Sequence, residues 1–496
     1  MTHPKGGSKC LSARAKARMP SPLLRGWWRR RRSSSMVRVR PHRISVWTTV
    51  LSVLLHFCWR GAGQRLTGLG NISPPTSVST PPFFRFCGVN FTERWLQLVD
   101  DMKIATHVTR ETDGARCMYG LRRTESGKGI EEFAINEETG ESILTQGLSK
   151  VVGPFLVRIA GIRRLRPPAV AKLSSLPPHD KSSCSLCGDG MPLRLQLRER
   201  IGTLTVPRTQ RRWDLHFNIS PQQATGHALL VPTLSLEENR RGQALTREDC
   251  IDLVLLGFEA GRAGRVGIEG EVGGEEEAGE CEGDKHIGHC DATDVAAAAS
   301  LCVNYNAPGA GASQNHLHAH VWTQFGRYPV DRAALLMKNE WRWSREASRT
   351  SKTDEGPGRT RRRRDLTEGG GVTARIVQYP AAAVCFMGED PIEIGDAVYD
   401  VIVEAESRGL TYNLLISGGG RDEAADVVGV YLFLRGRGEQ NERPSVLGQR
   451  IGAGQMAGEW IIDRPDVFER ATESSITEAL AQTRPDGKTG ACVGND

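Results

Sequence analysis

Three histidines at alternate positions, His316, His318 and His320, are the residues of this chain best suited to chemistry. They follow the small-residue run 307–313, in which backbone N–H groups can approach an anion closely. In an extended segment this spacing places all three imidazoles on one face. An imidazole beside a phosphate-binding loop suggests a nucleophile that attacks phosphorus. The alternatives are a histidine-rich strand or a metal site, and neither needs a glycine loop.

The charge of the chain is divided unevenly along its length. The formal net charge is +7, but residues 1–92 contain sixteen Lys and Arg residues and no Asp or Glu. The remaining residues hold 49 basic and 58 acidic side chains, a net charge of −9. The folded part is therefore expected to be mildly acidic, and the basic isoelectric point does not argue for nucleic-acid binding. We expect no nucleic-acid partner.

Residues 1–85 are predicted to be a basic leader. From Met36 a basic stretch precedes the apolar run Ile44–Trp59, a pattern typical of a signal peptide or short anchor. Residues 62–85 have the composition of a Pro/Ser linker. The twelve cysteines lack the density of a disulfide scaffold, which favours a reducing compartment. We expect a cytoplasmic protein; the alternative is an organellar or membrane-anchored one that meets a membrane or targeting machinery through residues 36–60.

The rest of the chain is expected to form an α+β protein with two units. The first unit, residues 86–343, should contain a helix near Arg94 and a helix capped by Thr246. Its predicted strands are Trp213–Ile219, His227–Val231, Ser300–Tyr305 and His316–Trp322. Residues 261–290 are Gly/Glu-rich and are predicted to be a disordered insertion.

A low-complexity linker, residues 344–371, precedes the second unit, residues 372–485, and a tail follows at 486–496. The helical spacing of apolar residues ends at Gly409, a predicted stop; these residues are Ile394, Ala397, Val398, Val401, Ile402 and Ala405. Three strands and a helix should follow: Thr411–Ser417, Gly429–Arg435, Glu459–Asp463 and Pro465–Ala481. The element order predicts two related antiparallel units and not a doubly wound parallel sheet. The sequence allows a homodimer without specifying one.

The run 311–320, Gly-Ala-Ser-Gln-Asn-His-Leu-His-Ala-His, resembles the histidine-triad superfamily, in its nucleotidyltransferase branch. The pattern is most similar to the family of GDP-D-glucose phosphorylase and GDP-L-galactose phosphorylase. Four further segments fit in the right order: 218–232, 328–331, 412–417 and 457–471. The resemblance covers residues 86–485, interrupted by the two low-complexity segments. It implies two histidine-triad-like units of antiparallel sheet packed with helices.

The resemblance also implies an activity, in which GDP-D-glucose and phosphate give GDP and hexose 1-phosphate. The family's nucleophile, the middle histidine, corresponds to His318, which would form a guanylyl-histidine intermediate. A backbone carbonyl could hold its other ring nitrogen as N–H. His316 and His320 would orient His318 or bind non-bridging oxygens. Inorganic phosphate is then a co-substrate, no cofactor is expected, and the site should be accessible to solvent.

The loop would bind the phosphates of the nucleotide. Amides of Gly311, Ala312, Ser313 and Gln314, with the Ser313 hydroxyl, would stabilise charge on the phosphoryl oxygens. Asn306 would tie the backbone of this loop or serve simply as a turn-forming residue.

Several features keep alternatives open. His320 matches the animal-type pattern, whereas the plant enzymes resemble His-x-His-x-Gln. The stretch Gly311–Gln314 also resembles diadenosine tetraphosphate phosphorylases, and Glu459 stands where the family usually has histidine. The alternatives are a GDP-L-galactose phosphorylase of ascorbate synthesis, a diadenosine tetraphosphate phosphorylase-like enzyme and a non-catalytic nucleotide-binding regulator.

Cys184 and Cys187 form a CxxC pair. In hexose-1-phosphate uridylyltransferases, which this branch resembles distantly, such a pair binds a metal together with the first histidine of the motif. The resemblance therefore offers zinc at Cys184, Cys187 and His316, with or without His227, as the alternative to a metal-free site. We expect no metal, with His227 a strand residue. Arg435 is expected to be a solvated strand end, with contact to phosphate as its alternative.

Overall fold

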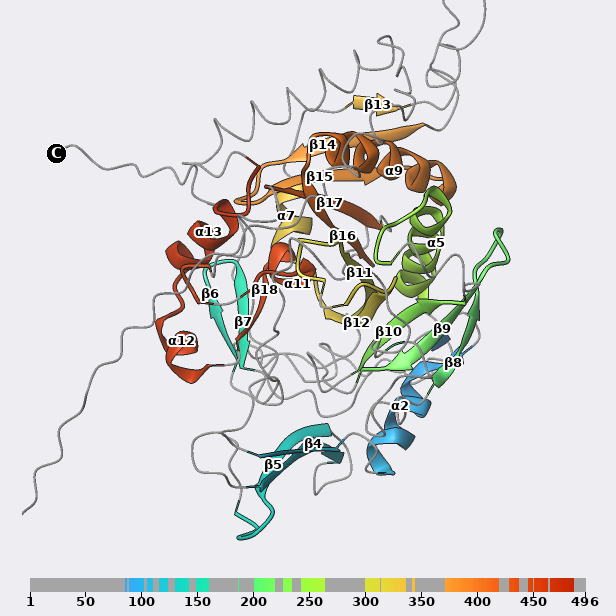
Figure 1. Ribbon diagram of the computed structural model, residues 1–496. Coiled ribbons are helices and arrows are strands. Elements are labelled where there is room, and N and C mark those ends of the chain that lie inside the picture. Colours follow the sequence, from blue (N-terminus) through green and yellow to red (C-terminus); the bar gives the residue numbers. More distant parts are fainter. Residues whose placement is uncertain are drawn as a thin grey trace, which may run out of the picture. The chain divides into compact units, whose positions relative to one another are not determined.

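The computed structural model has a mixed α+β architecture built around antiparallel sheet (Figure 1). The residues that the structure describes are 85–86, 89–101, 105–109, 116–123, 130–141, 149–159, 186, 200–218, 226–233, 242–263, 299–312, 314–335, 341–343, 371–418, 428–436, 445–448, 450–462 and 464–485. The predicted leader up to residue 84, the insertion from residue 264, the linker between 344 and 370 and the tail lie outside them. Within the described part of the chain, no helix combines the length and the apolar character needed to cross a membrane.

The largest element is a ten-stranded sheet in which every neighbouring pair is antiparallel. Its strands lie in the order β13 (Trp341–Trp343), β14 (Val372–Val377), β15 (Ala382–Met387), β17 (Gly429–Arg435), β16 (Thr411–Ser417), β11 (Ala299–Asn306), β12 (Ala319–Phe325), β10 (His227–Pro232), β9 (Arg212–Phe217) and β8 (Arg200–Thr205). One three-stranded sheet contains β18 (Glu459–Ile462), β7 (Phe155–Ile159) and β6 (Ser149–Val152), and another contains β3 (Ala105–Thr109), β4 (Arg116–Arg123) and β5 (Ile130–Asn136). The short strands β1 (Arg85–Phe86) and β2 (Val89–Asn90) pair with each other.

The two halves of the large sheet share one topology. In the first half, β9 and β10 precede helix α5 (Arg247–Ala263), β11 and β12 follow it, and the spatial order is β9-β10-β12-β11. In the second half, β14 and β15 precede helix α9 (Pro391–Ser407), β16 and β17 follow it, and the order is β14-β15-β17-β16. The halves meet where β11 pairs with β16, with Asn306 opposite Asn413. Strands predicted for two units therefore form one continuous sheet.

Each face of this sheet carries its own buried core. On β11, Leu301, Val303 and Tyr305 belong to a core that includes residues of α2 (Phe91–Asp100), α5 and α9. Cys302, which points the opposite way because strand side chains alternate, belongs to the second core. That core includes residues of α7 (Pro329–Leu335), α11 (Ala453–Ala457), α12 (Pro465–Arg470), α13 (Glu473–Ala481) and β7. The sheet is thus the middle layer between two sets of helices.

Helices α5 and α9 lie against each other over the first face (Figure 1). The predicted cap of α5 is confirmed, because the Thr246 hydroxyl accepts the Asp249 N–H at 3.3 Å. A Cβ at Gly395 would lie 2.7 Å from the Ile251 Cα, so the close approach of the two helices requires glycine there. The predicted stop at Gly409 has φ 71°, in the left-handed region. All six apolar positions predicted for the buried face of α9 are buried.

Several elements differ from the sequence expectation. Strands β14 and β15 precede α9, where no strand was predicted. The segment Glu459–Ile462 is a strand, but it pairs with β7 and not with the large sheet. The single predicted C-terminal helix is two helices, because Thr472 starts a new one by accepting the Ser475 N–H at 3.2 Å.

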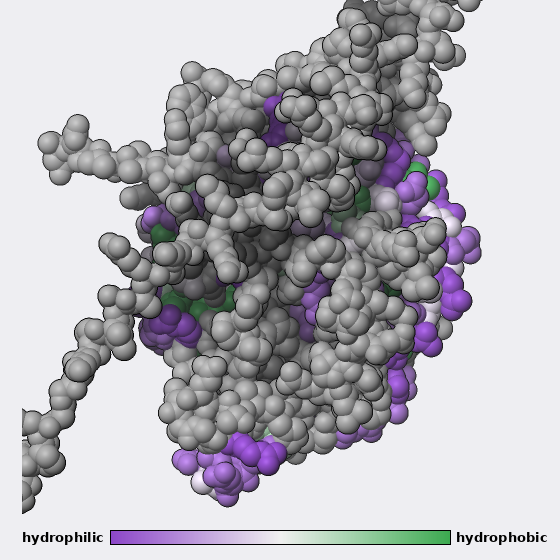
Figure 2. All heavy atoms as spheres, viewed as in Figure 1, coloured by the Kyte–Doolittle hydropathy of each residue, from purple (hydrophilic) through white to green (hydrophobic). Residues whose placement is uncertain are grey.

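Large apolar side chains of the described residues are mostly internal. Within the described segments, Val403 and Val446 are the large apolar residues with the most exposure, 46% each. Figure 2 shows mainly hydrophilic side chains along the edge where α5 and α9 lie. Single exposed valines of this kind are ordinary and do not indicate an interface.

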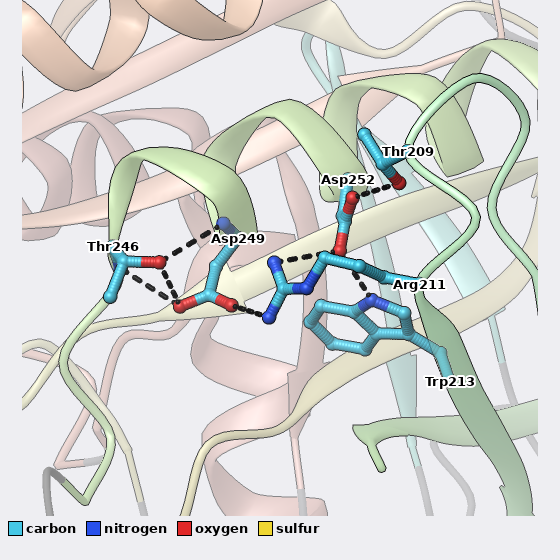
Figure 3. Close-up of polar contacts among 6 residues, drawn as sticks. All are labelled: Thr209, Arg211, Trp213, Thr246, Asp249 and Asp252. Carbon is cyan, nitrogen blue, oxygen red and sulfur yellow. Dashed lines mark hydrogen bonds and ion pairs between the residues drawn. The ribbon is translucent and has the colours of Figure 1, made fainter. Parts of the chain in front are cut away.

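A buried ion cluster fixes the β8–β9 hairpin to α5 (Figure 3). Arg211 pairs with Asp249 at 3.0 Å and with Asp252 at 2.9 Å, and both carboxylates are fully buried. The Asp252 carboxylate also accepts hydrogen bonds from the Trp213 indole at 2.9 Å and the Thr209 hydroxyl at 2.7 Å. Burial raises the pKa of Asp252, while these hydrogen bonds and Arg211 oppose the rise. The charged form of Asp252 therefore depends on its donors.

We predict that Thr209→Val lowers the free energy of unfolding by about 1–2 kcal/mol, because a buried carboxylate loses a hydrogen bond while side-chain volume is kept. Urea denaturation followed by fluorescence measures the change. Thr205→Val, at an exposed position of β8, is the control and should change stability by less than about 0.5 kcal/mol. Equal effects of the two substitutions would contradict the account of the cluster.

Candidate active site

The turn after β11 packs directly on the segment that precedes α11. Gly309 has φ 74° and Gly311 has φ 100°, values in the left-handed region that favours glycine. A Cβ at Gly311 would lie 3.2 Å from the Ile451 carbonyl oxygen and 3.3 Å from the Gly452 Cα. The turn and this segment are therefore in close backbone contact, and a side chain at position 311 would push them apart.

The three predicted histidines follow this turn in different conformations. His316 lies in a bend, His318 lies just before β12, and only His320 lies in the strand, which begins at Ala319. The prediction that one strand starts at His316 is wrong. His316 and His318 are each 4% exposed, so the expectation of a solvent-accessible site is also wrong.

The ring of His318 is held in one tautomer. Its Nδ1 lies 2.8 Å from the backbone carbonyl oxygen of His316. A carbonyl oxygen only accepts hydrogen bonds, so Nδ1 carries the proton and Nε2 keeps its lone pair in the neutral ring. This is the arrangement that the sequence analysis anticipated for a nucleophilic histidine. The His318 and His320 ring centroids are 5.3 Å apart, with the rings nearly perpendicular.

Gln243 fixes the backbone at His318, a role that was not predicted from the sequence. Its Oε1 accepts the His318 N–H at 3.0 Å, and its Nε2 donates to the His318 carbonyl at 2.9 Å and the Asn306 carbonyl at 3.1 Å. The Gln243 N–H donates to the Asn315 side-chain oxygen at 3.0 Å, which ties the same segment a second time. Gln243 is fully buried. The side-chain amide of Gln243 therefore forms with the His318 backbone the hydrogen bonds that a neighbouring strand would otherwise form.

A fourth histidine, His227, contacts the three histidines of the motif through His320. His227 on β10 places Nε2 3.0 Å from the His320 Nδ1 and 3.0 Å from the Asn218 Nδ2. Both contacts are satisfied when His227 Nε2 accepts and the other two nitrogens donate. His227 was expected to be a strand residue, with zinc binding as its alternative, and in the structure it fixes the orientation of His320. The pattern Gly226-His227 before an apolar strand was the available signal.

Asn306 ties the turn to the C-terminal half. Its Oδ1 accepts the Asn413 Nδ2 at 2.7 Å and the Ala453 N–H, at the start of α11, at 2.9 Å. Asn413 also donates to the Ala310 carbonyl at 2.7 Å. The side chain of Asn306 thus holds the loop in place, which is the first of the two roles expected for it.

The remaining predicted residues are placed as follows. Ala312 is buried, Gly311 and Gln314 are half-buried, and Ser313 lies outside the described residues. Cys184 and Cys187, the cysteines of the zinc alternative, also lie outside them. His316 is described, and within the described segments no group of three or more His, Cys, Asp or Glu side chains is arranged to hold a metal ion.

Two charged residues, Arg435 and Glu459, differ from what the sequence led us to expect. Arg435 was expected to be solvated, and Glu459 stands where the family that the sequence resembles usually has histidine. Arg435 is 2% exposed, so the prediction of a solvated strand end is wrong. Glu459 is buried and forms an ion pair with Arg158 on β7. The Tyr328 hydroxyl donates to Glu459 at 3.2 Å and accepts the Trp322 indole N–H at 2.9 Å. Through these contacts Glu459 attaches the small sheet to the face that carries the histidines.

We predict that Gln243→Glu lowers the free energy of unfolding by about 2–3 kcal/mol, because a carboxylate would face two carbonyl oxygens in a buried site. Urea denaturation measures the loss. Gln97→Glu, on the exposed face of α2, makes the same chemical change at the surface and should have little effect. If both variants were as stable as the unaltered chain, Gln243 would not be a brace of this site.

No protein-family model matches the chain, and no curated protein or solved structure matches it either.

Proposed function

We propose that this protein is a nucleotidyl-transferring phosphorylase that cleaves a GDP-hexose, with GDP-D-glucose as the expected substrate, to GDP and hexose 1-phosphate. The observation that carries the proposal is the 2.8 Å contact from His318 Nδ1 to the His316 carbonyl, which leaves Nε2 as the nucleophilic nitrogen. The glycine turn next to it offers backbone donors for the phosphoryl oxygens.

We further propose that the two halves of the sheet are histidine-triad-like units. The support is topological: each half has two strands, a helix and two strands, in the same spatial order. The histidine motif occurs in the first half only. On this proposal the first half supplies the nucleophile, and the second half supplies the brace around the loop.

The reaction proceeds in two displacements at the same phosphorus. His318 Nε2 attacks the α-phosphorus, a P–N bond forms, and the P–O bond to the departing hexose 1-phosphate breaks. An oxygen of inorganic phosphate then attacks the α-phosphorus, the P–N bond breaks, and GDP forms. Because a phosphate monoester is a good leaving group, the first step needs no strong general acid.

The other residues of the site hold the reacting groups in place. Gln243 fixes the backbone of His318, so that Nε2 is positioned before the substrate arrives. His320, oriented by His227, lies beside the nucleophile. The turn amides at Gly311 and Ala312 would stabilise the charge that spreads over those oxygens.

The same two chemical steps would apply to substrates with another nucleobase or another sugar. GDP-L-galactose and diadenosine tetraphosphate would use the same nucleophile and the same two steps, so a panel of these compounds with phosphate distinguishes them. A non-catalytic nucleotide-binding regulator is the alternative from another class. The presence of His316, His318 and His320 together favours the enzyme, because a binding protein has no need of the middle nucleophile.

We predict a covalent intermediate on His318. Full-length protein mixed with GDP-glucose in the absence of phosphate should gain a guanylyl group that is labile to acid, because a phosphoramidate hydrolyses readily once protonated. Peptide mass spectrometry should locate it within His316–His320. His318→Ala should remove the adduct and lower turnover by about 10⁴-fold or more, as expected for loss of a nucleophile, whereas His107→Ala, in the separate β3–β5 sheet, should retain both. Normal turnover by His318→Ala would exclude this mechanism.

We also predict that phosphate, and not water, is the acceptor. Release of hexose 1-phosphate should be at least about tenfold faster at saturating phosphate than without it, because an anion-binding turn positions the incoming phosphate. A coupled assay for hexose 1-phosphate measures both rates. Equal rates with and without phosphate would make the protein a hydrolase.

A further inference from the structure

The last residue of β17, Arg435, places a buried guanidinium behind the glycine turn. Its Nη1 donates to the Ile451 carbonyl at 2.7 Å, the Ala310 carbonyl at 3.1 Å and the Asn413 Oδ1 at 3.1 Å. The side chain is 2% exposed. One nitrogen of Arg435 therefore joins the turn, β16 and the segment before α11.

The partners of Arg435 are neutral. Its contacts within the described residues are two carbonyls and an amide oxygen, and no carboxylate pairs with it. By contrast, Arg158, Arg211 and Arg247 each pair with an Asp or Glu. Burial lowers the pKa of Arg435 to about 9, because removal from water disfavours the charged form. A buried cation with neutral partners is a favourable neighbour for an anion.

The contact with Ala310 also orients the turn. The Ala310 carbonyl accepts hydrogen bonds from both Arg435 and Asn413, so it faces the C-terminal half. In a planar trans peptide the N–H of the next residue points the opposite way. The Gly311 N–H is therefore directed away from Arg435, and a non-glycine residue at position 311 would strain this geometry.

We propose that Arg435 is a positioning residue of an anion site at the glycine turn, where it orients the Gly311 amide and supplies uncompensated positive charge. The identity of the anion as the phosphates of a nucleotide rests on the proposed function. A neutral donor could orient the Gly311 amide in the same way, but only a guanidinium also adds positive charge next to the turn. The C-terminal half then contributes to phosphate binding although it carries no histidine of the motif.

The test compares the binding of inorganic pyrophosphate, GDP and guanosine by isothermal titration calorimetry at low salt. Arg435→Gln keeps hydrogen-bonding groups but removes the charge, and Arg435→Lys restores the charge. We expect Arg435→Gln to weaken pyrophosphate and GDP about tenfold or more, the scale of one charge interaction in a partly buried site, while guanosine binding stays unchanged. Arg435→Lys should recover much of the loss. Arg247→Gln, which removes a cation from the α5–α9 face, is the matched control and should bind all three ligands normally.

Each remaining outcome decides the question. Equal weakening of GDP and guanosine by Arg435→Gln would mean a purely structural brace and would overturn the proposal, as would unchanged pyrophosphate binding or no pyrophosphate binding by the unaltered chain. If Arg435→Gln does not fold, Asn413→Asp replaces it, because a carboxylate 3.1 Å from Nη1 would compensate the charge and should weaken pyrophosphate likewise. Normal pyrophosphate binding by Asn413→Asp would then overturn the proposal. If the chain binds pyrophosphate through Arg435 but binds no nucleotide, the proposed function fails and this inference stands.

Discussion

The antiparallel pairing of β11 with β16 is the constraint on which the rest of the structure depends. Its register sets Val303 opposite Ile416 and Asn306 opposite Asn413. That pairing joins two halves of equal topology into one sheet. It also places the polar side chains of β16 and β17 beside the turn that follows β11. Without it, the loop would lose its contacts with Asn413 and Arg435.

The two faces of the sheet serve different purposes as a result. On one face α5 and α9 pack closely, and Gly395 permits their approach. The other face carries Asn306, His320 and Trp322 among the apolar residues of the second core. Because strand side chains alternate, each central strand contributes to stability on one side and to the candidate site on the other. Buried polar groups are costly unless hydrogen-bonded, which accounts for the dense bonding around Asn306 and Gln243.

Much of this arrangement could be predicted from local sequence patterns. The helical spacing in α9 and the cap at Thr246 gave both long helices, because these signals lie within a few residues of each other. The motif at His316–His320 identified the candidate nucleophile and the bond to its other ring nitrogen. Strand β15 was missed because Ala382–Met387 carries no alternation of polar and apolar residues, whereas β14 does alternate over Val372–Ile376 and that signal was overlooked.

What could not be predicted depends on contacts between distant residues. The start of β12 is set by Gln243, about 75 residues away in sequence, whose amide occupies the position of a strand. The burial of Arg435 follows from its contacts with Ala310 and Ile451, and nothing in its own neighbourhood indicates them. His227 takes its role from the pairing of β10 with β12. These residues share a site only because the sheet brings them together.

The most direct test of a covalent histidine intermediate is the stereochemical course at phosphorus. A single diastereomer of GDP-glucose with sulfur on the α-phosphorus would be cleaved with phosphate, and the configuration of the resulting GDP α-thiophosphate determined by ³¹P NMR. Two successive in-line displacements, through His318 and then phosphate, predict net retention. Net inversion would mean that phosphate attacks the substrate directly, and would contradict the role assigned to His318.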